Sequence, residues 1–237
     1  MNAGMPGPNW QYNEMRHVGT NYASQAEVQA YDERMRKLRD IDGEIRHALD
    51  LLNLQPHQTL LEIGTGTGSL AIAAAKCCRR VVAVDISAVM LEYAAGKAMA
   101  CGASNVEFVH AGFLTFAAGE QFDAAASQIA LHHLPDFWKM VAMHRLAGML
   151  RPGARFFLQD VVYSFDVADH AQAVEGWLAD YASKAGPHRA EDAARHVRDE
   201  HSTMAWMMEG ILQRAGFRIE KAAFSGKLFA EYLCVKQ

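Results

Sequence analysis

Two apolar segments with different sequence patterns are separated by a turn that has glycine at alternate positions, Gly64, Gly66 and Gly68. Residues 59–63 have the composition of a short buried strand, whereas residues 69–77 are alanine-rich and predict a helix. Glycines between a strand and a helix let a ligand approach the backbone closely, because no Cβ stands in the way. The turn therefore indicates an α/β fold with a binding site beyond its first strand.

The segments after this turn alternate between the two patterns. Further strands are expected at residues 80–84, 106–110, 122–127 and 155–160, and helices at 88–100 and 136–150, the last ended by Arg151-Pro152-Gly153. Strands separated by helices predict a parallel sheet with right-handed crossovers. The strands are almost continuously apolar, as expected when helices cover both faces of the sheet.

The flanking regions extend this pattern. Apolar residues recur at intervals of three and four from Met35 to Leu52 and predict one helix face, which Pro56 closes. Residues 166–200 are polar, alanine-rich and expected to be helical, and another helix is expected near 202–215. Strands at 217–223 and 227–235 follow, joined by a short turn at Ser225-Gly226, and should pair antiparallel.

The predicted organisation is an irregular, aromatic lid segment at residues 1–25 and one domain at 26–237, with a helical insertion at about 163–205. The 237 residues are 51% hydrophobic and carry a net charge of −4, which gives no electrostatic footprint for nucleic acid. No apolar run approaches the roughly 20 residues of a membrane helix, and the four cysteines suggest reduced thiols. We expect a cytoplasmic protein that acts on a small molecule, and a homodimer is left open.

Asp85 ends the second expected strand. A carboxylate at this position can accept two hydrogen bonds from a ribose diol. The alternative is that it caps the helix that starts near Ala88, which Ser87 could also do. Ile86 next to it would cover one face of an adenine ring, or would be an ordinary core residue.

The spacing of the glycines bears on which nucleotide is bound. Dinucleotide sites use GxGxxG to approach a pyrophosphate, whereas this turn reads GxGxG and is preceded by Glu62. An acid at the entrance suits an amino group better than a pyrophosphate, and adenosylmethionine carries an ammonium group and no phosphate. Alternatively, Glu62 braces the loop.

Four motifs in order resemble the class I S-adenosylmethionine-dependent methyltransferases, in particular the small-molecule group that includes the ubiquinone and menaquinone methyltransferases. The motifs are LLEIGTGTG, VVAVDIS, the segment from Ser127 to Asp136, and LRPGARFFLQD, and RAGFRIE resembles the entry to a sixth strand. The resemblance covers roughly residues 40–237. It implies a seven-stranded, Rossmann-like, doubly wound sheet whose last strand inserts antiparallel between strands five and six.

The resemblance also implies roles for residues. S-adenosyl-L-methionine would be the cofactor and S-adenosyl-L-homocysteine the product. Glu62 would support the amino end and Asp85 the ribose, and the methionine part would be bordered by Gly64, Thr65, Gly66, Gly68, Gln128 and Ile129. Members often have an acid after strand three that binds the adenine amine. Here Gly112 and Phe113 follow instead, so their backbone groups are expected to serve.

A sulfonium methyl is already electrophilic, so the enzyme mainly has to hold the acceptor in line with it. A general base is needed only where the acceptor must lose a proton. Candidate catalytic residues are His132 and His133, which follow strand four and could instead shape the loop, and Asp160, which ends strand five. In the N-terminal segment, Tyr22 could contact the methionine carboxylate, and His17 belongs to the same lid.

The insertion is where this family usually builds its acceptor pocket, which makes His196, His201 and Trp206 candidates. Together with His188, these histidines match no familiar ligand spacing, so they are interpreted as surface residues and no metal is expected. Two alternatives remain open. One is a nicotinamide-dependent oxidoreductase of the doubly wound fold, and the other is a non-catalytic methyltransferase-like binding module.

Overall fold

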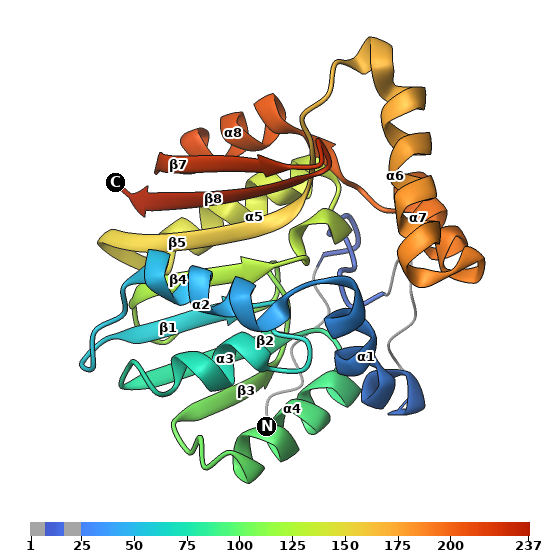
Figure 1. The fold of residues 1–237 in the computed structure, drawn as a ribbon. Coiled ribbons are helices and arrows are strands. Elements are labelled where there is room, and N and C mark those ends of the chain that lie inside the picture. The colour runs from blue at the N-terminus through green and yellow to red at the C-terminus, as the bar shows by residue number, and fades with distance from the viewer. Residues whose placement is uncertain (1–7, 17–24) are drawn as a thin grey trace.

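The computed structural model describes residues 8–16 and 25–237, which form helices around a central sheet (Figure 1). The strands are β1 (Thr59–Ile63), β2 (Arg80–Asp85), β3 (Val106–His110), β4 (Phe122–Gln128), β5 (Leu150–Tyr163), β6 (Thr203–Met204), β7 (Phe217–Ser225) and β8 (Phe229–Lys236). The α-helices are α1 (Gln25–Leu38), α2 (Ile41–Leu52), α3 (Ser69–Ala74), α4 (Ala88–Ala100), α5 (Asp136–Gly148), α6 (His170–Ala185), α7 (Pro187–Asp199) and α8 (Ala205–Arg214). Two short 3₁₀ turns are η1 (Leu131–His133) and η2 (Val167–Asp169).

The sheet has the order β3-β2-β1-β4-β5-β8-β7, with the two-residue β6 pairing β5 beside this path. Strands β1 to β5 run parallel to one another, and β8 pairs antiparallel with both β5 and β7. The predicted mostly parallel α/β sheet with an antiparallel last strand is therefore confirmed. The strand order reverses between β1 and β4, which is where a doubly wound sheet binds its ligand.

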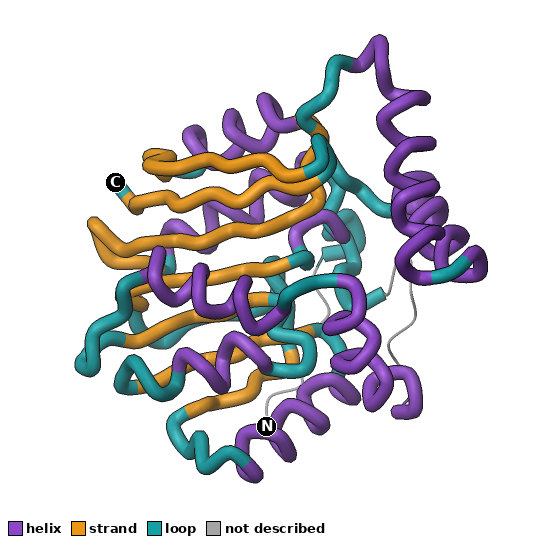
Figure 2. Tube along the Cα trace, in the orientation of Figure 1, coloured by secondary structure: helices purple, strands orange, loops and turns teal. Residues whose placement is uncertain are grey.

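Helices cover both faces of the sheet (Figure 2). Each face has its own core of buried side chains. Neighbouring residues of β1 point to opposite sides, so that Leu60 packs with α2 and α3 while Leu61 packs with α5 and α8. This explains the continuous apolar runs in the sequence, since both faces are buried. None of the helices in the described ranges has an apolar stretch long enough to cross a membrane.

The helix face expected from Met35 to Leu52 is divided between two helices, because α1 ends at Leu38 and α2 begins at Ile41. Asp40 is the N-cap of α2, and its side chain accepts a hydrogen bond from the amide of Gly43 at 3.0 Å. The apolar spacing continues across the break, so periodicity alone could not reveal it. The capping aspartate was the available signal.

The segment Arg151-Pro152-Gly153 does not end a helix that reaches Leu150, as the sequence had suggested. Helix α5 stops at Gly148 and Leu150 already begins β5, pairing with Phe122. The register then shifts, and Gly153 takes a φ of +80°. Bulges tolerate proline and glycine within a strand.

In the terminal hairpin the turn extends beyond the predicted Ser225-Gly226. Lys227 has a φ of +62°, and β8 begins at Phe229.

Tyr232 on β8 has no exposed surface, and its hydroxyl has no hydrogen-bond partner within the described part of the chain. Burial raises the pKa of this phenol. Because an unpaired buried hydroxyl is unfavourable, we predict that Tyr232→Phe raises the free energy of unfolding by about 1 kcal/mol in urea titrations.

Tyr163→Phe is the matched control, because Tyr163 shares a hydrogen bond with Ser202 and should lose stability without its hydroxyl. A loss of more than about 1 kcal/mol in Tyr232→Phe would show that its hydroxyl is satisfied.

Candidate active site

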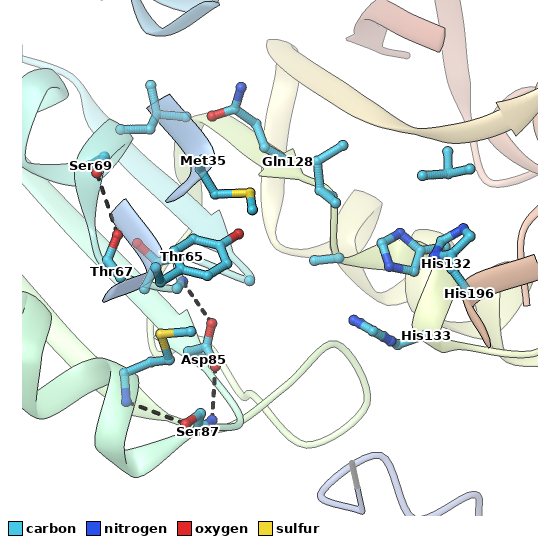
Figure 3. Close-up of a pocket in the computed structure, with 18 of the residues that line it drawn as sticks. Met35, Thr65, Thr67, Ser69, Asp85, Ser87, Gln128, His132, His133 and His196 are labelled. Atoms are coloured by element: carbon cyan, nitrogen blue, oxygen red, sulfur yellow. Dashed lines mark hydrogen bonds between the residues drawn. The ribbon is translucent and has the colours of Figure 1, made fainter. Parts of the chain in front are cut away.

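A cavity of about 460 Å³ lies at the carboxyl-terminal edge of the parallel strands. The loops after β1, β2, β3 and β4 form its floor, and residues of α1, α6 and α7 line other sides. Figure 3 shows its two ends, with Thr65 and Asp85 on one side and a cluster of histidines on the other. Its size is that of a typical cavity for a small organic ligand.

The glycine turn after β1 has all three glycines in the left-handed region, with φ values of +81°, +53° and +75° for Gly64, Gly66 and Gly68. A Cβ on Gly64 would lie 2.2 Å from that of Ala130, and one on Gly68 would lie 2.9 Å from that of Ala94. Nothing lies within 4 Å of the corresponding position on Gly66. Gly66 therefore presents bare backbone to the cavity, whereas Gly68 packs against α4 and does not line the cavity as the sequence had suggested.

Asp85 is 9% exposed and holds the turn in place (Figure 3). Its Oδ2 accepts a hydrogen bond from the Gly66 amide at 2.7 Å, and its Oδ1 accepts one from the Ser87 amide at 2.8 Å. Ser87 is the N-cap of α4, its hydroxyl accepting from the Met90 amide, so the capping role falls to Ser87. Asp85 also lines the cavity, where a ligand can reach its carboxylate.

Glu62 lines the cavity but is only 2% exposed. The hydroxyl of Thr65 donates to its Oε2 at 2.9 Å, so this residue does brace the turn, through a hydroxyl. Burial raises the pKa of the Glu62 carboxyl to about 8, because the charged form is poorly solvated there. A cationic ligand group next to it would favour the charged form.

Glu14 contributes a carboxylate that the sequence reasoning missed. It is buried, and its Oε1 accepts hydrogen bonds from the Leu114 amide and the Thr115 hydroxyl, both at 2.8 Å. A Cβ built on Gly112 would lie 2.5 Å from Glu14 Oε2. An acid from the N-terminal segment thus occupies the space of the side chain that is absent after β3. The sequence held no signal for this, because nothing in it links residue 14 to residue 112.

Helix α1 is attached to the glycine turn by hydrogen bonds. The Thr67 hydroxyl donates to Asp32 at 2.6 Å, and Lys97 on α4 bridges Asp32 and Ser69 at 2.5 and 3.1 Å. These bonds place Tyr31 and Met35 on the cavity wall. The expected lid residues Tyr22 and His17 lie outside the described residues.

His132 and Asp160 form a buried pair. The Asp160 carboxylate accepts from the His132 backbone amide at 3.0 Å and contacts its ring Nδ1 at 2.5 Å. The other ring nitrogen, Nε2, lies 3.2 Å from Glu200 of the insertion. Burial alone would lower the pKa of His132, but the two carboxylates outweigh it and raise the pKa to about 9. The two carboxylates therefore favour the protonated form of His132.

The chain leaves β4 through a strained residue. Ile129 has a φ of +51°, which a β-branched side chain rarely adopts, and its amide donates to the Gln159 carbonyl at 2.8 Å. The neighbouring Gln128 side chain donates to the Gln159 side chain at 2.8 Å. Such strain concentrates at functional sites, and η1, which follows Ile129, supplies His132 and His133 to the cavity.

Comparison with known proteins identifies the family to which this fold and this cavity belong. Residues 60–153 match the family described as "Methyltransferase domain". An uncharacterized methyltransferase of Geobacillus kaustophilus is 28% identical over 191 residues, 80% of this chain and 81% of the relative. The chain is a class I S-adenosylmethionine-dependent methyltransferase. The comparisons do not separate the ubiquinone and menaquinone group from the others, so that finer assignment stays a prediction.

Other relatives of this methyltransferase carry more specific names. A 27-O-demethylrifamycin SV methyltransferase of Amycolatopsis mediterranei is 28% identical over 194 residues, 73% of this chain and 71% of the relative. A ribosomal protein L11 methyltransferase of Rhodopseudomonas palustris is 35% identical over 151 residues, but these are 57% of this chain and 51% of the relative. Among solved structures, an S-adenosylmethionine-dependent methyltransferase from Aquifex aeolicus has the same fold, with a TM-score of 0.64, 19% identity, and coverage of 90% of this chain and 99% of that one.

The predicted catalytic residues of the methyltransferase differ in their access to the cavity. Asp160 has no exposed surface and does not line the cavity, and both ring nitrogens of His132 face carboxylates. His133 lines the cavity, and its ring lies on the cavity side of the cluster (Figure 3). Burial and the neighbouring His132 lower the pKa of His133 to about 3, so its ring is neutral. Of these three residues, His133 is best placed to meet an acceptor.

The insertion supplies a different set of residues from the expected one. Trp206 is 70% exposed, and neither it nor His201 lines the cavity. His196 is not a surface residue, since its side chain is 12% exposed and contacts Glu200 at 2.5 Å. Trp177, which was not anticipated, lines the cavity beside His196, with ring centroids 6.0 Å apart.

The cavity fits the cofactor of the methyltransferases by its charges. Its turn end collects carboxylates from Glu62, Asp85 and Glu14, and Gly66 leaves room for a ligand at bare backbone. Carboxylates suit an ammonium group, a sugar diol and an aromatic amine, which are among the polar groups that adenosylmethionine offers. Carboxylates beside the turn suit a pyrophosphate poorly, which disfavours a nicotinamide dinucleotide.

The raised pKa of Glu62 gives a testable dependence of stability on pH. Its carboxyl titrates near 4.5 when exposed and at about 8 in the fold, so the folded state holds an extra proton between these values. The contribution of Glu62 to stability therefore falls as pH rises through this window. We predict that Glu62→Gln, measured without ligand by urea unfolding, gains stability over the wild type from pH 5 towards pH 8.

Glu92→Gln, an exposed substitution on α4, is the control and should show no such trend. A difference between wild type and Glu62→Gln that does not change with pH would contradict the raised pKa.

Proposed function

We propose that the enzyme transfers the methyl group of adenosylmethionine to a small-molecule acceptor by in-line displacement. The observation that carries this proposal is the position of the second end of the cavity. Trp177 and His196 of the insertion and Phe229 of β8 line it, over the edge of the sheet. An acceptor held there is surrounded by side chains of the domain, which suits a small molecule better than a folded protein.

We propose an orientation for the bound cofactor from the positions of the three carboxylates. Glu62 faces the ammonium group, Asp85 binds the ribose hydroxyls, and Glu14 binds the adenine amine in place of the missing acid after β3. Ile86 covers the adenine ring, and Gly112 and Phe113 border it. Thr65 and Gly66, with Gln128 and Ile129, border the methionine part. This pose places the reactive end near the strained exit of β4.

When bound, adenosylmethionine supplies a sulfonium methyl that a nucleophile can displace. The residues of the chain orient the acceptor and exclude water from it. In this proposal His133 is the catalytic residue that hydrogen-bonds the acceptor, since its neutral ring faces the cavity. His132 and Asp160 are positioning residues, because their buried ion pair holds η1 and thereby orients His133.

The named relatives do not decide the acceptor by themselves. One is named for demethylrifamycin and another for a ribosomal protein, and the chain spans only about half of the latter. The side chains that surround the second end of the cavity favour a small-molecule acceptor over a protein. A non-catalytic binding module is disfavoured by the intact turn, by Asp85 and by the histidine at the second end.

The proposal is tested by offering the enzyme adenosylmethionine with a labelled methyl group, together with the metabolite fraction and the protein fraction of one cell extract. We predict label in the metabolite fraction, and no label there with Gly66→Val, whose side chain would fill the open space at Gly66. Label confined to the protein fraction would contradict the small-molecule assignment.

Asp85→Ala should weaken adenosylmethionine binding by about tenfold or more, because ribose hydrogen bonds and the brace on Gly66 are lost together. Isothermal titration calorimetry measures this directly. Asp50→Ala, an exposed change on α2, is the control and should bind as the wild type does. Unchanged affinity in Asp85→Ala would refute the ribose role.

The role of Glu14 is tested with two ligands that differ only in the base, adenosylhomocysteine and its hypoxanthine analogue. A carboxylate accepts from the adenine amine but repels the carbonyl oxygen of hypoxanthine. We predict that the wild type prefers the adenine ligand by about tenfold and that Glu14→Gln loses most of this preference. Glu33→Gln, exposed on α1, should retain it.

A preference that Glu14→Gln leaves unchanged would show that the base is recognised elsewhere. Retained binding of the adenine ligand by the variant shows that the fold is intact.

A further inference from the structure

The histidine cluster at the second end of the cavity brings together residues that are distant in sequence. His132 and His133 follow β4, whereas Glu200 and His196 belong to the end of the insertion. One ligand atom from each of His132, His133 and Glu200 lies within 4.8 Å of the other two. Spacing in the sequence could not reveal this set, because the insertion separates its two parts.

The orientation of His132 is that of a metal ligand. Its Nδ1 is bonded to Asp160 at 2.5 Å, which leaves Nε2 directed at Glu200 at 3.2 Å. Histidines that bind metals usually donate their other ring N–H to a carboxylate, which fixes the ring. Glu200 is held in turn by His196 Nδ1 at 2.5 Å, and His196 Nε2 is bonded to Ser202 at 2.8 Å. Each ligand candidate except His133 therefore has a partner that aims it.

His133 supplies a separate observation. Its Nδ1 is buried and has no hydrogen-bond partner among the residues that the structure describes, and it lies 3.9 Å from Glu200 Oε2. A buried ring nitrogen without a partner is unfavourable unless something else binds it. In Figure 3 the His133 ring is turned towards the same space as His132 and His196.

We propose that His132 Nε2, His133 Nδ1 and Glu200 Oε2 bind a divalent transition-metal ion at the acceptor end of the cavity. Ligands about 2.0–2.1 Å from a tetrahedral ion stand roughly 3.4 Å apart. The distances of 3.2 and 3.9 Å from Glu200 are close to this spacing. On binding, the ion takes the place of the proton on His132 Nε2, which passes to solvent.

The donor set selects the class of metal. Two imidazoles and one carboxylate suit zinc and its neighbours in the first transition row better than magnesium or calcium. Three protein ligands leave a coordination position open, and all three of these residues line the cavity. An acceptor hydroxyl in that position would lose its proton more easily. This last step rests on the proposed function, whereas the metal site does not.

The experiment uses the full chain, freed of metals with a chelator, and measures Zn²⁺ binding by competition with a chromophoric chelator. Co²⁺ in place of Zn²⁺ gives an absorption spectrum that reports coordination. We expect saturable binding of a single ion per chain. Glu200→Gln and His133→Ala should each weaken it by about tenfold or more, and Asp160→Asn by about 10- to 100-fold.

His144→Ala, which removes an exposed histidine of α5, is the matched control and should bind Zn²⁺ as the wild type does. Adenosylhomocysteine binding, followed by calorimetry, identifies variants that remain folded and tests the cofactor site independently. Failure of the wild type to bind Zn²⁺, or equal binding by folded Glu200→Gln and His133→Ala, would overturn the metal site. Loss of cofactor binding alone would overturn only the proposed function.

Discussion

The hydrogen bond from the Gly66 amide to Asp85 Oδ2 is the contact on which the site depends, because it joins the ends of the two strands that carry it. The amides of Gly64 and Thr65 donate to the Val84 carbonyl at 2.8 and 3.0 Å and complete the connection. Together these bonds hold the turn in a conformation that places the bare backbone of Gly66 at the cavity. Because β1 and β2 pair in parallel, the Asp85 carboxylate at the end of β2 lies beside the glycine turn at the end of β1. The pairing of the strands therefore positions this part of the site.

The two ends of the cavity differ in their chemistry. The turn end gathers the carboxylates of Glu62, Asp85 and Glu14, and burial keeps the pKa of Glu62 raised in the absence of a neighbouring cation. The other end holds acids that are already paired, since Asp160 and Glu200 both face His132. Ile129, at the strained exit of β4, also lines the cavity. One end is thus suited to a cationic nucleoside, and the other to the orientation of an acceptor or a metal ion.

Much of the architecture could be predicted from the sequence because the signals are local. Strands Thr59–Ile63 and Val106–His110 have the predicted bounds, since both are short segments of strand-forming residues that follow a polar residue. The turn with Gly64 and Gly66 followed from its place between a strand and a helix. The break at Asp40 and the bulge at Gly153 were missed, because apolar spacing continues across the first and Pro-Gly is more typical of turns than of strands.

The parts of the site that depend on long-range contacts could not be predicted. Glu14 reaches Leu114 across 100 positions, and Glu200 meets His132 only after the insertion folds over the sheet. No local pattern encodes such pairs. For the same reason His196 was interpreted as exposed, and Gly68 was assigned to the ligand although its lack of a side chain serves the packing of α4.

A crystal structure of the enzyme with adenosylhomocysteine tests the central claim most directly. The account predicts the adenine amine at Glu14, the ribose hydroxyls at Asp85 and the sulfur facing His133. A ligand bound with its base among the histidines, or bound outside this cavity, would contradict it.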